Sequence, residues 1–147
     1  LGDGGFRVVV AGPEGITVMV RALDVRGPTV AWADGYRQVQ GTSFTIGASR
    51  RPFIGVSRHA SPGLADFLRQ QGYVLEVSEE RHRYEYYLDE TEFTADQELS
   101  LLAQIEAAGC PLVRLGRWPN GARSALAITG DIDSLTLWDY GLRLLGR

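Results

Sequence analysis

The spacing of apolar residues along this chain changes near Arg50, and this change limits the folds that it can form. Before Arg50, short runs rich in β-branched residues alternate with turns of Gly, Pro and Asp, which is typical of antiparallel strands. The expected strands lie at residues 6–11, 16–22, 29–32, 36–40 and 43–46. The Gly-Pro-Glu-Gly turn at residues 12–15 predicts a hairpin between the first two runs. Residues 1–47 are therefore predicted to form a β-rich segment, folded as an antiparallel meander.

Beyond this segment, apolar residues recur at the spacing of helices. Ser61 followed by Pro62 is typical of a helix start, and Gly72 is typical of a helix end. The face of this helix that we expect to be buried comprises Leu64, Phe67 and Leu68.

A second helix is predicted by the capping-box spacing of Thr94 and Gln97, with Gly109 as its end. Its expected buried stripe comprises Leu99, Leu102, Ile105 and Ala108. Further strands are expected at residues 52–57, 73–77, 84–88, 111–115 and 125–129, and a last helix at about 134–145.

Strands that alternate with helices predict a mostly parallel sheet. The expected fold class is α/β or α+β, with the antiparallel meander followed by an alternating β/α unit. This divides the chain into a β-rich segment at residues 1–47 and an α/β unit at residues 48–147, which are compatible with one shared domain.

Charge and composition exclude several classes of function. The 147 residues carry 18 acidic and 15 basic side chains, a balance that argues against nucleic-acid binding. No apolar run reaches the roughly 20 residues that cross a bilayer, so no membrane insertion is expected. Every basic residue is Arg, which excludes lysine nucleophiles, and Cys110 is the single cysteine, expected as a small buried apolar residue. The compartment stays open.

The most informative motif is an expected apolar strand at residues 125–129 that is followed by Asp131 and Asp133. Carboxylates two residues apart in an extended chain point the same way. At the carboxyl end of a strand, such a pair suits a hard cation. The alternative is structural, because Asp133 or Ser134 can cap the last helix while Asp131 only turns the chain.

This motif resembles the opening of the polysaccharide deacetylase (NodB-homology) family, carbohydrate esterase family four. Residues 118–123 read WPNGAR and residues 129–133 read TGDID, which is similar to the Thr-x-Asp-x-Asp motif of that family. The resemblance spans about residues 117–140 and implies that Asp131 is the general base and Asp133 a metal ligand.

The family takes its other metal ligands from a later His-x-x-x-His motif, whereas His59 and His82 both lie upstream here. The chain is therefore interpreted as a non-catalytic or incomplete domain of a deacetylase-like protein. The whole protein would remove N- or O-acetyl groups from a glycan with a divalent metal, which this chain alone is not expected to bind tightly. Its expected partners are a carbohydrate or another domain of the same protein. The alternative is a glycan- or protein-binding module or scaffold without chemistry of its own.

Two further residues are candidates for ligand binding. His59 lies between an expected strand and helix, where it could bind an anion or a sugar hydroxyl, or be a loop residue without a role. Trp32 lies near Asp34 and Tyr36 and could stack on a sugar ring, or pack in the core. His82 belongs to a charged run that is expected to be a solvated surface.

Overall fold

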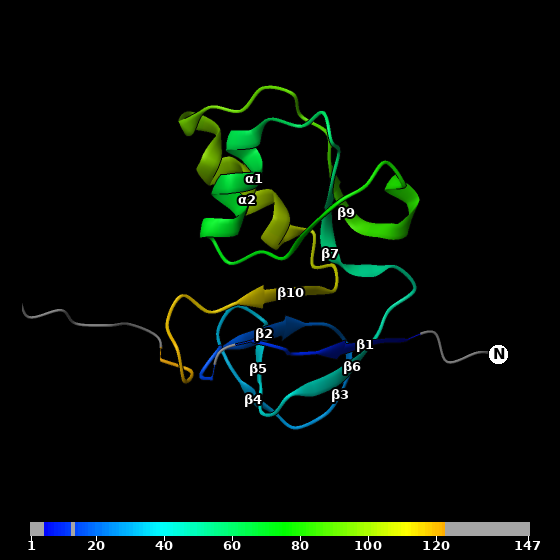
Figure 1. Cartoon of the computed structure of the whole chain (residues 1–147), viewed down its shortest axis with the longest axis vertical. Coiled ribbons are helices and arrows are strands. Elements are labelled where there is room, and N and C mark those ends of the chain that lie inside the picture. Colours follow the sequence, from blue (N-terminus) through cyan, green and yellow to red (C-terminus); the bar gives the residue numbers. More distant parts are fainter. Residues whose placement is uncertain (1–4, 13, 123–147) are drawn as a thin grey trace, which may run out of the picture.

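The computed structural model describes residues 5–12 and 14–122, and these form two lobes (Figure 1). The β lobe consists of antiparallel sheets, and the α/β lobe consists of a parallel sheet with two helices. The chain passes from the first lobe to the second near Arg50, where its hydrophobic pattern changes. An α+β architecture with both kinds of sheet confirms the predicted fold class.

The β lobe contains two antiparallel sheets, ordered β1-β6-β3 and β10-β2-β5-β4. Its strands are β1 (Gly5–Val9), β2 (Val18–Arg21), β3 (Asp24–Arg26), β4 (Thr29–Ala31), β5 (Arg37–Val39), β6 (Ser43–Gly47) and β10 (Leu112–Leu115). The antiparallel pairing predicted for this segment is confirmed. Its strands, however, are divided between two sheets rather than following one another in sequence order. The buried core of this lobe comprises Val18, Val20, Val39, Phe44, Ile46 and Val113.

The predicted hairpin between the first two strands is wrong. β1 pairs with β6, from Gly5↔Gly47 to Val9↔Ser43, whereas β2 pairs with β5 and β10. The physical reason is burial: Val18, Met19 and Val20 are all buried, so both faces of β2 are covered and it takes an inner place in its sheet. β1 is half-buried on one face, exposed on the other, and lies at an edge.

The α/β lobe has a parallel sheet ordered β8-β7-β9, which confirms the predicted parallel pairing. Its strands are β7 (Arg51–Val56), β8 (Leu75–Val77) and β9 (Tyr84–Leu88), with a short 3₁₀ turn, η1 (Arg81–Arg83), before β9. Helices α1 (Pro62–Gln70) and α2 (Glu98–Ala107) lie on the same side of β7 and β9 in Figure 1. The core between them and the sheet includes Ile54, Val56, Leu64, Leu68 and Ile105.

The first predicted helix is confirmed in its start, its buried face and its end. α1 begins at Pro62, and Leu64, Phe67 and Leu68 are buried. Gly72 follows with a φ of 88°, a backbone conformation that favours glycine. A Cβ at Gly72 would also collide with the carbonyl oxygen of Leu115. Both the backbone conformation and the space around this position therefore require glycine.

The second helix is confirmed in its capping box, but its predicted buried stripe is partly wrong. Thr94 and Gln97 form both capping-box bonds. Ile105 is buried and Leu102 is half-buried, whereas Leu99 is 81% exposed and Leu101 is buried instead. The cause is the 3₁₀ turn η2 (Ala95–Gln97), which separates the cap from α2 and changes the direction of the following side chains. Ala108, also predicted in the stripe, is exposed at the end of α2.

Strand β10 joins the two lobes. It pairs with β2 in the β lobe, and on its other side Leu115 N donates to Gly72 O over 2.7 Å. Leu112 is buried in the core of the α/β lobe, while Val113 is buried in the core of the β lobe. The two lobes therefore share one strand, from which the chain continues toward the motif of residues 129–133. The strand and helix predicted at residues 125–129 and 134–145 lie outside the described residues.

Candidate functional site

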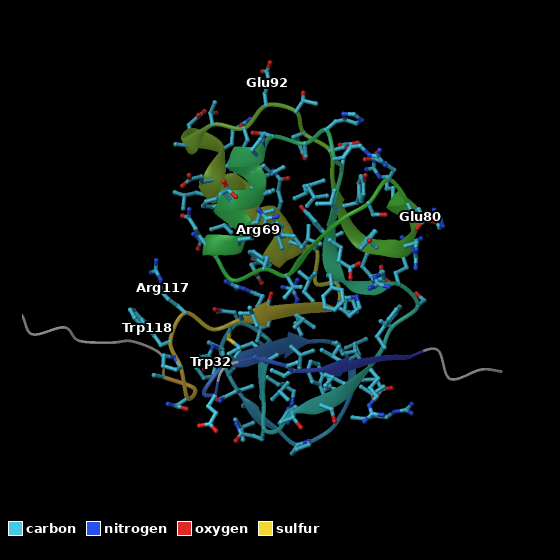
Figure 2. All side chains as sticks on the ribbon, viewed as in Figure 1. Trp32, Arg69, Glu80, Glu92, Arg117 and Trp118 are labelled. Carbon is cyan, nitrogen blue, oxygen red and sulfur yellow. The ribbon has the colours of Figure 1, made fainter. Side chains whose placement is uncertain are left out.

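The two carboxylates with predicted roles, Asp131 and Asp133, lie outside the described residues. The structure does describe the turn that leads to them, and it describes a cluster of charged residues between the lobes. The segment that follows β10 carries Arg117 and Trp118 (Figure 2).

Residues 116–121, here called the exit turn, are held by one buried side chain. Thr17 is 2% exposed, and its Oγ1 donates to Trp118 O over 2.7 Å and accepts from Gly121 N over 2.8 Å. The backbone adds bonds from Gly116 N to Thr17 O and from Asn120 N to Gly15 O, both of 2.7 Å. Both hydrogen-bonding functions of a buried hydroxyl are thus used to fix this turn.

Residues 118–121 form a turn, and their residue types have a physical reason. Asn120 and Gly121 have φ values of 55° and 70°, in the left-handed region that Asn and Gly tolerate best. A Cβ on Gly121 would also displace the side-chain amide of Gln38 on β5.

A second feature, here called the Glu106 cluster, lies between the lobes and comprises Arg21, Tyr36, Tyr73, Glu106 and Arg114. Glu106 extends from the last turn of α2 and accepts from four side chains. The bonds are 2.5 Å from Arg21 Nη1, 3.3 Å from Arg114 Nη1 and 3.1 Å from the Tyr36 hydroxyl, and the Tyr73 hydroxyl donates as well. Arg114 also lies over the rings of Tyr73 and Tyr36, at 4.4 and 5.3 Å from their centroids.

The Glu106 cluster carries more positive than negative charge. Burial, followed by the nearby Glu106 carboxylate, raises the pKa of Tyr36 to about 12. Burial and the hydrogen bond to Glu106 also raise the pKa of Tyr73, so both tyrosines stay neutral at physiological pH. Two guanidinium groups, with side chains 11% and 23% exposed, then share a single carboxylate. Arg114 Nε is buried and has no hydrogen-bond partner in the part of the chain that the structure describes.

A cavity of about 480 Å³, here called the arginine pocket, opens beside this cluster, between the end of α1 and β10. Figure 2 shows Arg117 on the segment that follows β10 and Arg69 above it on α1. Arg117 is exposed and has no hydrogen bond or ion pair within residues 5–12 and 14–122. The described residues that line the pocket include no Asp or Glu: they are Met19, Arg69, Gln70, Gln71, Gly72, Tyr73, Arg114, Leu115, Gly116 and Arg117.

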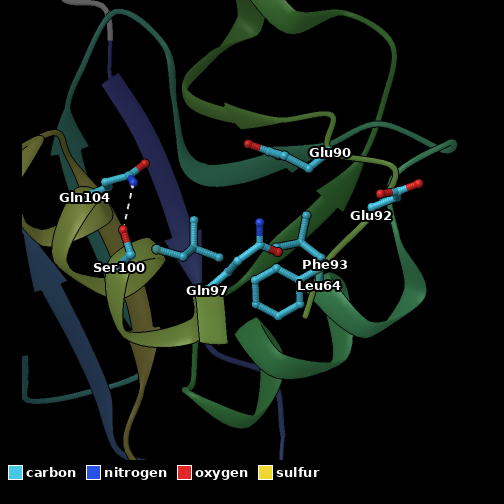
Figure 3. A pocket seen from close by; sticks show the side chains of 8 residues that line it. Leu64, Glu90, Glu92, Phe93, Gln97, Ser100 and Gln104 are labelled. Carbon is cyan, nitrogen blue, oxygen red and sulfur yellow. Dashed lines mark hydrogen bonds between the residues drawn. The ribbon is translucent and has the colours of Figure 1, made fainter. Parts of the chain in front are cut away.

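A smaller cavity of about 140 Å³ lies between α1, α2 and residues 90–93 (Figure 3). Ser100 and Gln104 are hydrogen-bonded to each other across 3.2 Å on its wall, and the carboxylates of Glu90 and Glu92 point in different directions. These groups do not converge on a common point. Among residues 5–12 and 14–122, no group of three or more His, Cys, Asp or Glu side chains is placed to hold a metal ion.

The remaining sequence candidates are not brought together. His59 is exposed in the loop after β7, where its backbone N donates to Ser57 Oγ over 3.1 Å. Trp32 is half-buried at the turn between β4 and β5, in the other lobe. His82 is exposed in η1, as expected of a solvated charged run. Cys110 is half-buried, and this burial raises the pKa of its thiol.

Sequence reasoning missed the Glu106 cluster, because its members come from separate elements. Arg21 and Glu106 are 85 positions apart, and Tyr36 and Glu106 are 70 apart. One local signal was available: Arg114 interrupts the otherwise apolar strand at residues 111–115. A charged residue inside a strand that is buried on both sides requires a partner.

Comparisons with protein-family models, with curated proteins and with solved structures found no match to this chain.

Proposed function

We propose that residues 5–122 form a non-catalytic accessory domain of a polysaccharide deacetylase-like protein, and that this domain anchors the segment that carries Asp131 and Asp133. The whole protein would hydrolyse N- or O-acetyl groups on a glycan. The observation that supports this role is the exit turn, which the buried Thr17 hydroxyl holds in place just before the deacetylase-like motif.

The roles of the two carboxylates come from the family resemblance. Asp131 would take the proton of the attacking water, and Asp133 would hold a divalent metal. When bound, that metal polarises the acetyl carbonyl and lowers the pKa of the water. Geometry is decisive for such chemistry, because a displacement of about 1 Å at the reacting groups can lower the rate about a hundredfold. An exit turn that holds the backbone just before the motif would therefore help to keep Asp131 and Asp133 in their reactive positions.

In this role the described residues position the segment that carries Asp131 and Asp133. Their own histidines, His59 and His82, are both exposed on the α/β lobe, whereas the exit turn is anchored to the β lobe. The missing metal ligands and the general acid would be supplied by other parts of the protein.

The test is the substitution Thr17→Val in the full-length protein that contains this chain. Val has nearly the same shape as Thr but can neither donate to Trp118 nor accept from Gly121. We expect kcat/KM for acetate release from an acetylated oligosaccharide to fall about tenfold or more, with the larger share of the loss in kcat. Hydrogen exchange at the Gly121 amide should accelerate in the same variant.

The matched control is Thr42→Val, since Thr42 is exposed and its side chain forms no hydrogen bond among the described residues. It should leave both readouts unchanged. The positioning role is refuted if Thr17→Val accelerates exchange at Gly121 and yet retains full activity.

A second candidate function is a glycan- or protein-binding module with no chemistry. The arginine pocket favours it, because a cavity that carries uncompensated positive charge is suited to a ligand. The two functions differ at Asp131, since Asp131→Asn should abolish acetate release by the full-length protein only if the motif is catalytic.

A further inference from the structure

We propose that the arginine pocket binds the carboxylate of an acidic sugar residue, with Arg117 and Arg69 as the groups that contact it directly. The preference for an anion rests on the charges and contacts of this pocket alone. The choice of a sugar as the carrier of the carboxylate rests on the proposed function.

The charges around the pocket favour an anion. Arg21 and Arg114 share the single carboxylate of Glu106, so one positive charge of this cluster has no acidic partner within residues 5–12 and 14–122. Arg69 has an exposed partner at 3.1 Å, Asp66 in the preceding turn of α1, and such surface pairs contribute little. Arg117 has no partner in the part of the chain that the structure describes. An anion that enters this pocket would therefore meet positive charge without a competing acidic wall.

Arg114, which lines the pocket, has an incompletely hydrogen-bonded guanidinium group. Its Nη2 donates to Gln71 O over 2.8 Å and its Nη1 to Glu106, while its Nε is buried without a partner among the described residues. Buried polar groups are normally satisfied, so the hydrogen bonding of this guanidinium group is incomplete among the described residues. Arg114 itself is too deeply involved in the Glu106 cluster to serve as a clean test.

The shape of the guanidinium groups and the volume of the pocket indicate the kind of anion. Guanidinium groups match planar carboxylates, to which they can donate two parallel hydrogen bonds. The two groups that would contact the ligand, Arg69 and Arg117, are both exposed guanidinium groups at the mouth of the pocket. The volume of about 480 Å³ lies within the range of small-molecule sites and exceeds what a bare oxyanion would fill. A carboxylate on a sugar ring fits both the guanidinium groups and this volume.

The test is an NMR titration of the 147-residue chain with glucuronate, with methyl glucoside and inorganic phosphate as comparison ligands. We expect saturable shifts of the amide signals of Gly72, Leu115 and Gly116 with glucuronate. Arg117→Gln should raise the Kd about tenfold or more, as expected for the loss of a charge-assisted hydrogen bond. The double variant Arg69→Gln/Arg117→Gln should abolish saturable binding.

Arg7→Gln is the control, because Arg7 is an exposed residue on β1 and its removal changes the net charge equally. It should leave the Kd unchanged. Equal binding of methyl glucoside, tighter binding of phosphate, or a Kd that Arg117→Gln does not change would each overturn the proposal. Because binding is measured on this chain, a failure here is independent of whether the full-length protein releases acetate.

Discussion

At the scale of single residues, Glu106 joins charged and polar side chains of both lobes. Its carboxylate accepts from two arginines and two tyrosines that belong to both lobes. Removal of the carboxylate leaves two guanidinium groups close together, both largely shielded from solvent. A buried ion pair adds little net stability, but removal of one partner leaves an uncompensated buried charge, which is costly.

We therefore expect Glu106→Gln to lower the free energy of unfolding by about 2 kcal/mol, the typical cost of a lost bond to a charged group. Urea denaturation at neutral pH measures this loss. Glu92→Gln is the control, because Glu92 is exposed in a loop, and it should change stability by less than about 0.5 kcal/mol. A loss of similar size in both variants would show that Glu106 has no special role.

Tyr36 predicts a pH dependence on the alkaline side. Burial and the adjacent Glu106 raise its pKa to about 12 in the folded protein, from 10.0. Between these values the unfolded chain loses the proton and the folded one retains it, so the unfolded state is favoured. The stability contribution of the neutral phenol is thus complete below pH 10 and is lost as the pH rises toward about 12.

Urea denaturation at several pH values between 9 and 12 checks this sign, with Tyr36→Phe as the comparison. The variant should lose less stability across this interval than the wild type does. The expectation fails if stability is flat, or if both proteins decline in parallel.

At the scale of elements, helix positions could be predicted better than helix faces. Proline, glycine and the capping box predicted where α1 and α2 begin and end, because these signals act on the local backbone. The buried face of α2 could not be derived in the same way. Leucines at positions 99, 101 and 102 fit more than one helical stripe, and the choice between stripes depends on packing against the sheet.

Leu101 and Leu99 provide a matched pair that tests this face. Leu101 is 8% exposed, so Leu101→Ala should lower the free energy of unfolding by about 2–4 kcal/mol. Leu99 is 81% exposed, so Leu99→Ala should cost less than about 0.5 kcal/mol. Thermal or urea denaturation of the two variants measures the difference, and the reverse order of costs would support the stripe that the sequence suggested.

Strand pairing was the least predictable level of the fold. The period of a strand shows which side chains face the core, but it does not show which partner the strand will take. β1 pairs with β6, and β2 pairs with β10 near the far end of the described chain. Such contacts depend on the packing of the complete lobe, so the local turn at residues 12–15 gave the wrong partner.

At the scale of the whole molecule, β10 links the fold to the proposed function. It is shared by the two lobes, and the exit turn that follows it is fixed by Thr17. The proposed deacetylase-like motif, with Asp131 and Asp133, rests on a short stretch of local sequence. The Glu106 cluster and the arginine pocket were not evident from local sequence, because they form only when residues from both lobes meet.

The central proposal is that this chain contributes an anchored part of a deacetylase-like protein. The measurement that tests it most directly is acetate release from acetylated oligosaccharides, with added zinc or cobalt, by the 147-residue chain and by the full-length protein that contains it. We expect no release by the chain alone, metal-dependent release by the full-length protein, and loss of that release in Asp131→Asn with an unchanged melting temperature. Release by the chain alone, or full activity in Asp131→Asn, would contradict the account.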